Sequence, residues 1–221
     1  MMKTIIGALL ISTTLLSCGG KSTNSGTSSS NNETADYNSI VVTYQNTVDM
    51  MGVKTTTNET IWSDEKNNRK ATFTSTETNF MGQNTKEESL SIENGDWGYN
   101  INLNDKTGTK SNIKEMKSMA TAMAAGLAMS GDLKDIKSLK DFVESNGGKM
   151  LPNETILGKE CTVYELMGTK QWLYKGMVLK AMMGDKVMMN AVKVEENVKI
   201  PAEKFEVPAG ITITEAPEMN E

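Results

Sequence analysis

The 221-residue sequence contains no histidine and only two cysteines, Cys18 and Cys161. The absence of histidine removes the most common general base and the most common metal-binding side chain. The two cysteines lie far apart in the sequence, so they need not form a disulfide. No basic cluster stands out against a net charge of −5, which argues against a nucleic-acid partner. We therefore expect a protein that is not an enzyme and that holds no metal and no dissociable cofactor.

The apolar run near the amino terminus is too short to span a bilayer as a helix. It covers residues 5–16, which is 12 residues, whereas a spanning helix needs about 20. Lys3 precedes the run, and the small residue Ser17 follows it. A positive start, a short apolar core and a small residue before the cleavage point are typical of a signal peptide, which we assign to residues 1–17.

The end of this signal is Leu15-Leu16-Ser17-Cys18-Gly19, which resembles the lipobox of bacterial lipoproteins. A leucine stands three residues before the cysteine, and a glycine follows it. The sequence departs from the family pattern at Leu16, where a small residue is more common. The resemblance implies cleavage before Cys18, diacylation of its sulfur and acylation of the new amino terminus. The alternative is an ordinary secretory signal, which would leave Cys18 free to form a disulfide with Cys161.

Residues 19–36 are rich in Ser, Asn, Thr and Gly and contain no large apolar side chain. Such a segment cannot bury enough surface to fold, so residues 18–36 are predicted to be a lipidated cysteine and a disordered tether. Its reach is about 23 Å for a flexible chain of this length. No aspartate follows Cys18 directly and no acidic cluster follows it closely. In similar lipoproteins these absences favour the outer membrane and its periplasmic side, where we expect this protein.

From residue 37 the pattern alternates with period two, which is typical of β-strands. Ile40, Val42 and Tyr44 share one parity, and Asn94-Gly95 between two strand patterns is a strong hairpin signal. Rows of Thr and Asn on the other parity favour a solvated convex face. The predicted strands are residues 37–50, 53–63, 69–80, 87–93 and 97–104, followed by 159–167, 170–174, 177–183 and 186–195.

Two helical patterns interrupt the strands. Residues 113–129 place Ile113, Met116, Ala120, Met123 and Leu127 on one face, with Asn112 as the predicted N-cap. A second helix is predicted from residue 132 to the glycines at 147 and 148, with an apolar face that includes Leu139, Phe142 and Val143. Because strands lie on both sides, we expect these helices to cover the concave face of a curved antiparallel sheet.

The carboxyl-terminal half resembles the LolA/LolB-like lipoprotein carriers and related lipid-anchored domains of unknown function. The resemblance rests on GKECTVY at 158–164, WLYKGMVLK at 172–180, and Ile200-Pro201, Phe205, Val207-Pro208 and Gly210. It implies an α+β fold over residues 37–214, a curved β half-barrel of about nine or more strands with two helices on its concave face. Residues 215–221 are expected to be a loose tail. In that family the sheet and its helical lid enclose an apolar cavity for acyl chains, and an anchored copy cannot shuttle.

The sequence is unusually rich in methionine, which accounts for 17 of its 221 residues. Flexible thioether side chains adapt to varied apolar partners, so methionines could line a groove for an acyl chain. The predicted groove comprises Met116, Met119, Met123, Leu127, Met177 and Met182. The alternative is ordinary core filling, because methionines at helical spacing usually lie in a core. The first interpretation predicts a holder of a hydrophobic ligand, and the second a structural or protein-interaction module of the envelope with a packed interior.

The acidic, cysteine and tryptophan residues do not indicate a catalytic site. The acidic pairs Asp64-Glu65, Glu87-Glu88 and Glu195-Glu196 lie at predicted turns or strand ends, where adjacent carboxylates point to opposite faces and are expected to be solvated. Cys161 has no histidine base to activate it and is expected to be a small buried residue. The three tryptophans, at 62, 97 and 172, are expected to anchor the core. The sequence therefore predicts no catalytic residue.

Overall fold

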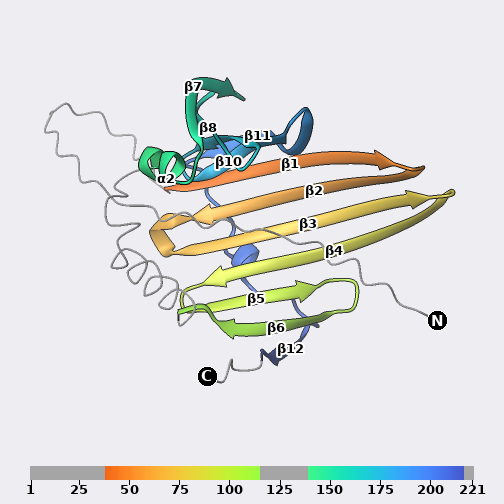
Figure 1. Cartoon of the computed structure of the whole chain (residues 1–221). Helices are drawn as coiled ribbons and strands as arrows, with labels where there is room; N and C mark the ends of the chain where they lie inside the picture. The colour runs from red at the N-terminus through yellow and green to blue at the C-terminus, as the bar shows by residue number, and fades with distance from the viewer. Residues whose placement is uncertain (1–37, 115–138, 217–221) are drawn as a thin grey trace, which may run out of the picture. The chain divides into compact units, whose positions relative to one another are not determined.

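The computed structural model describes residues 38–114 and 139–216, all of which belong to one compact unit, Thr34–Glu221. They contain an open mixed sheet of 12 strands in the order β12-β6-β5-β4-β3-β2-β1-β11-β10-β9-β8-β7 (Figure 1). The strands are β1 (Ser39–Met50), β2 (Val53–Asp64), β3 (Arg69–Phe80), β4 (Gln83–Asn94), β5 (Trp97–Asn102), β6 (Thr107–Asn112), β7 (Lys149–Ile156), β8 (Lys159–Leu166), β9 (Thr169–Tyr174), β10 (Met177–Met183), β11 (Lys186–Glu196) and β12 (Thr212–Glu215).

The first four strands have 12 residues each and pair in unbroken register. Their many threonines are β-branched and favour a pleated strand. Two-residue turns join β1 to β2 and β3 to β4, with Met51 and Gly52, then Met81 and Gly82, all at positive φ. Two successive residues at positive φ match the twist of a tight hairpin, although methionine seldom adopts that conformation.

The nine predicted strands are confirmed, but the sheet is larger and is not purely antiparallel. Strand β12 runs parallel to β6, with Thr212 opposite Thr107. The sequence pattern did not predict β6, β7 or β12. Strand β6 contains no large apolar residue, β7 contains Pro152 and a register shift, and β12 has only four residues. Strand β12 reaches Glu215, one residue beyond the predicted end of the domain at 214.

Of the two predicted helices, the described ranges contain the later part of the second as α2 (Leu139–Ser145). Its Val143 is fully buried as expected, whereas Phe142 is exposed. The helix predicted over 113–129 lies outside the described residues except for its first two positions, which are helical. There the Asn112 side chain accepts a hydrogen bond from the backbone N–H of Lys114 at 3.0 Å, which fits its predicted capping role. No helix in the part of the chain that the structure describes is long and apolar enough to cross a membrane.

Two hydrophobic clusters lie on opposite faces of strands β1 to β5. The inner cluster joins strands that are far apart in the sequence; its buried members are Ile40, Val42, Tyr44, Cys161, Val163, Trp172, Leu179 and Ala191. Its members follow neighbouring strands of the sheet, from β1 through β11, β10 and β9 to β8, and we call the face on which they lie the inner face. The strap cluster comprises Ala71, Ile92, Ile101 and Phe205 on the other face.

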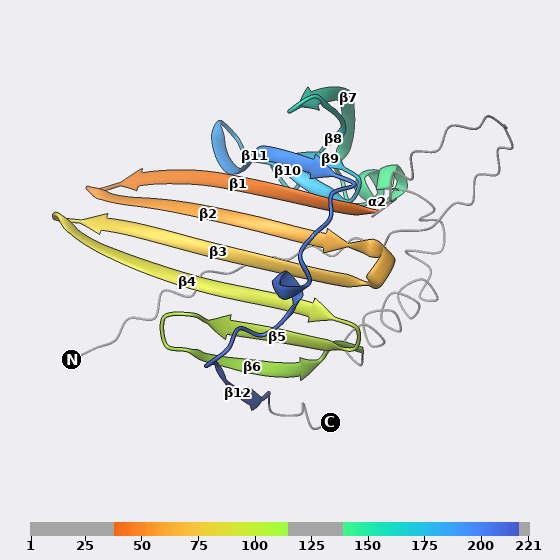
Figure 2. The same ribbon diagram turned by 180° about the vertical axis from the view of Figure 1, so that it is seen from behind.

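The strap, residues 197–211, leaves β11 and crosses that other face to reach β12 at the far edge (Figure 2). It contains the short 3-10 helix η2 (Ala202–Phe205), and a second 3-10 helix, η1 (Glu65–Asn67), links β2 to β3. The hydroxyl of Ser39 donates to the carbonyl of Val198 at 2.6 Å, which attaches the strap where it begins. The strap, through Phe205 at the end of η2, therefore covers the apolar rows of β3 to β5.

The threonine rows were predicted to lie on a solvated convex face, and this prediction is wrong. Tyr44 pairs with Glu59, Glu59 with Thr74 and Thr74 with Ser89, so these four residues share the inner face. The inner face is thus apolar at β1 and β8 to β11 and polar at β2 to β4. Trp97 is also no core anchor; it is 38% exposed, and the ammonium of Lys110 lies 3.6 Å from its ring centroid.

Candidate functional site

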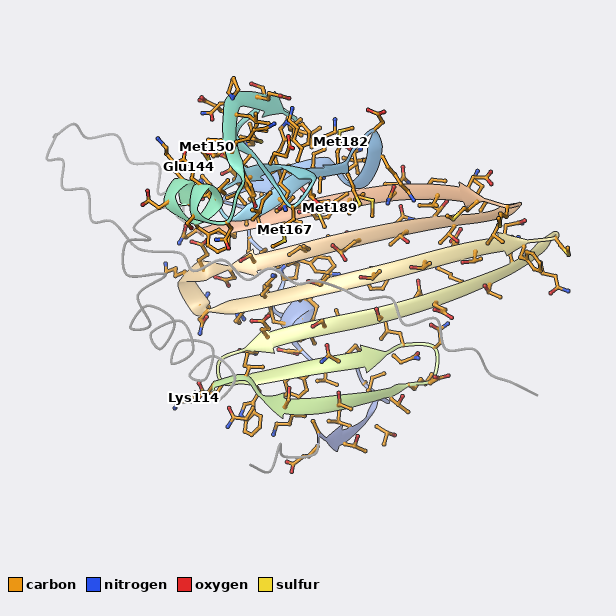
Figure 3. The ribbon with its side chains drawn as sticks, in the orientation of Figure 1. Lys114, Glu144, Met150, Met167, Met182 and Met189 are labelled. Atoms are coloured by element: carbon orange, nitrogen blue, oxygen red, sulfur yellow. The ribbon has the colours of Figure 1, made fainter. Side chains whose placement is uncertain are left out.

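The end of the β10–β11 hairpin concentrates methionine. Met182 and Met189, which are labelled in Figure 3, are partly buried against the inner cluster. Met177, at the start of β10, is also partly buried against this cluster. Met183 is 55% exposed and Met188 46% exposed on the same hairpin. We call Met182, Met183, Met188 and Met189 the methionine end of this hairpin. It presents adaptable apolar side chains at the margin of the inner cluster.

A side-chain hydrogen bond joins the methionine end to the rest of the sheet. The Asn46 amide on β1 donates to the backbone carbonyl of Met188 at 3.1 Å. Register shifts occur beside it, between Ala181 and Met182 and between Thr43 and Tyr44. Bulges bend a strand and redirect its side chains, so they account for the departure of this hairpin from simple alternation.

Of the predicted groove, only Met177 and Met182 lie within the described residues. Met177 and Met182 both contact the inner cluster. Met116, Met119, Met123 and Leu127 lie outside the described residues. The centre of the inner cluster is filled, because Val42, Val163 and Leu179 have no exposed surface. Two hollows open elsewhere, and their described lining residues include no methionine. A ligand could therefore meet the described methionines at the margin of the cluster rather than inside it.

A cluster of charged side chains lies on the inner face near the end of β11. The Glu196 carboxylate accepts hydrogen bonds from the ammonium groups of Lys159 and Lys175 and, at 3.0 Å to each oxygen, from the Tyr174 hydroxyl. The hydrogen bonds from the two lysines outweigh the effect of burial and lower the pKa of Glu196 to about 2. Glu196 was expected to be solvated, and that expectation is wrong because Lys159, on β8, folds next to the end of β11. Reasoning from adjacent residues could not have found this contact.

Glu196→Gln is expected to lower the free energy of unfolding by about 1–3 kcal/mol at pH 7, because charge-assisted hydrogen bonds are lost. The folded pKa lies below the ordinary value of 4.5, so this stabilisation is present above pH 4.5 and disappears as the pH falls toward about 2. Urea titrations of both proteins between pH 2 and 7 measure the difference. The matched control is Glu195→Gln, which removes an exposed pair with Lys193 and should change stability little. A difference that does not depend on pH would contradict this assignment.

A second partly buried carboxylate, Glu59, lies on the polar part of the inner face. Burial raises the pKa of Glu59, although a hydrogen bond from the Thr74 hydroxyl at 3.3 Å opposes that shift. Burial also raises the pKa of Tyr44, with a contribution from the charge of Glu59. A single carboxylate without a nucleophile or a second acid does not define a catalytic site.

Other candidate residues are structural. Cys161 is a free, fully buried thiol, as predicted, and burial raises its pKa. Trp172 is a core anchor, as expected; its indole N–H donates to Glu154 at 2.8 Å. Within residues 38–114 and 139–216, no group of three or more His, Cys, Asp and Glu side chains could hold a metal ion.

Comparisons with known proteins add no functional assignment. No family model matches this chain, and no curated protein matches it. Among solved structures, the chain is similar to an uncharacterized conserved protein from Thermus thermophilus. The similarity covers 83% of this chain and 93% of the other, with a TM-score of 0.45 and 6% sequence identity.

Proposed function

We propose that this chain is a lipid-anchored lipoprotein of the cell envelope that holds an acyl chain or another hydrophobic ligand at the methionine end of the β10–β11 hairpin. The lipobox-like sequence at Cys18 supports the anchor. The absence of an aspartate directly after Cys18, and of an acidic cluster close behind it, supports a location on the periplasmic side of the outer membrane. The resemblance to the LolA/LolB-like carriers supports an acyl ligand. The observation that carries the proposal is the group of partly exposed methionines beside the inner cluster.

The centre of the inner cluster is filled and its margin consists of flexible methionines, so we expect the ligand to bind along the surface of the cluster. Half-exposed methionines lose contact with water when an acyl chain covers them, and their flexible side chains can repack around it. Exposed apolar surface of this kind often marks a ligand or interaction site. The polar inner face of β2 to β4 would then accommodate the polar end of an amphipathic ligand.

Native mass spectrometry of the full chain carrying Cys18→Ser tests this proposal. We expect a co-purified hydrophobic adduct that is reduced in the additional variant Met182→Ser/Met188→Ser. The matched control is Met51→Ser/Met81→Ser, which makes the same chemical change at two exposed turn residues. The proposal fails if all spectra show only ligand-free protein, or if the two double variants lose the adduct equally.

The second candidate is a protein-interaction module with a packed interior. It is favoured by the turns between β1 and β2 and between β3 and β4, where Met51 is 100% exposed and Met81 84% exposed. Val53 pairs with Phe80, so the two turns lie side by side. A photo-crosslinking residue at position 51 or 81 would give a specific band with an envelope protein in cells, and the same residue at position 95 would not. Absence of any specific band would remove this candidate.

A further inference from the structure

A hollow of about 430 Å³ opens where β1, β2 and β3 meet the start of the strap. Its charged lining residues are Lys66, Arg69, Lys199 and Asp64. Three cations thus face one carboxylate. Ser39 also lines this hollow, and it is the first residue of β1.

The carboxylate is already fully engaged. Asp64 accepts hydrogen bonds from the backbone N–H and the side-chain amide of Asn67, at 3.2 and 2.8 Å, and from Arg69 at 2.5 Å. Burial favours its neutral form, but the hydrogen bonds from Asn67 and Arg69 hold the pKa of Asp64 below its ordinary value. Its charge therefore neutralises Arg69 and leaves the two lysines without a matching anion in the lining.

Arg69 is held in place from two sides. Its guanidinium lies 4.5 Å from the ring centroid of Phe205 on the strap, and one Nη2 bond goes to Asp64. Its Nε is buried and makes no hydrogen bond to the described residues. The guanidinium therefore retains donor capacity that Asp64 does not use.

We infer that this hollow binds a phosphate group. Lys66 and Lys199 supply mobile cationic donors, and Arg69 supplies a fixed planar donor, which is the combination that phosphate oxygens favour. The volume exceeds that of a phosphate ion and leaves room for the group to which the phosphate is attached. The phosphate could belong to a free phosphate compound or to a phospholipid headgroup, because the predicted tether ends next to Ser39.

Titration of inorganic phosphate by calorimetry tests the inference, in the full chain carrying Cys18→Ser. Lys66→Ala/Lys199→Ala is expected to weaken phosphate binding about tenfold or more, because the double variant removes two charge-assisted contacts to the phosphate oxygens. Both lysines are exposed and form no ion pair with a described residue, so the double variant should keep the parent melting temperature. The charge-matched control, Lys54→Ala/Lys186→Ala, should bind phosphate as the parent does.

Vesicles distinguish the two sources of phosphate. Co-sedimentation with phosphatidylglycerol vesicles, against phosphatidylcholine vesicles, is measured for the same three proteins. Loss of vesicle binding in the Lys66/Lys199 variant alone assigns the site to a lipid headgroup, and loss of free phosphate binding alone assigns it to a soluble phosphate compound. If the variant and the control behave alike with both probes, the inference is overturned. These measurements need neither the anchor nor the methionine end, so their failure would leave the proposed function in place.

Discussion

Phe205→Ala is expected to lower the free energy of unfolding by about 3–5 kcal/mol, the usual range for truncating a buried phenylalanine. Phe205 is only 2% exposed and packs against Ala71, Ile92 and Ile101. Its backbone carbonyl also accepts a hydrogen bond from Asn94 at 3.4 Å. The truncated side chain would leave a cavity beneath the strap and remove the ring on which Arg69 stacks.

Urea denaturation followed by circular dichroism measures this loss as a lower transition midpoint at an unchanged slope. The matched control is Phe80→Ala, at a position that is 48% exposed beside a hairpin turn, where the change should stay below about 1 kcal/mol. Equal losses in the two variants would contradict the role of the strap as the cover of this face. A changed slope would instead mean that the strap detaches before the sheet unfolds.

Cys18→Ser is expected to move the protein from the membrane fraction to the soluble fraction. Several acyl chains anchor a protein durably, because each buried methylene contributes roughly 0.8 kcal/mol. A serine at this position offers no sulfur for diacylation, so the mass of the intact protein should also lack the added lipid. Cell fractionation with immunoblotting and intact-protein mass spectrometry measure the two effects.

The control for this prediction is Cys161→Ser. Cys161 is a free, buried thiol on β8, so its substitution should leave the protein in the membrane fraction. A Cys18→Ser protein that stays with the membrane through a carbonate wash would contradict the lipid anchor. If the parent protein, with Cys18 intact, has the mass of an unlipidated chain cleaved elsewhere, the result would instead support the ordinary secretory signal.

The strands were predictable because their signals are local. The alternation of Ile40, Val42 and Tyr44 and the Asn94-Gly95 turn each depend on neighbouring residues alone. The three strands that were not predicted lack such signals. Strand β6 has no row of large apolar side chains. Strand β12 is short and pairs with β6 because the strap ends beside that edge of the sheet. The face assigned to the threonine rows was wrong for a related reason. Alternation says that two faces differ, but it does not say toward which face the sheet curls.

The candidate sites were less predictable than the strands. Methionine content drew attention to Met177 and Met182, and both pack against the inner cluster. It could not show that the centre of that cluster is filled by Val42, Val163 and Leu179, because packing depends on strands that are distant in the sequence. Asp64 was expected to be solvated, yet it is buried at a hairpin end where Arg69 lies only five residues away.

The sequence by itself determined where the chain alternates and turns, because backbone conformation over five to ten residues follows from the side chains in that window. Tertiary structure alone decided what those strands bury and which charges meet. Lys159 reaches Glu196 across 37 residues of sequence, and Arg69 reaches Phe205 on the strap. Such contacts depend on the curl of the sheet and on the path of the strap, both of which are set by the whole fold and by no single window of residues.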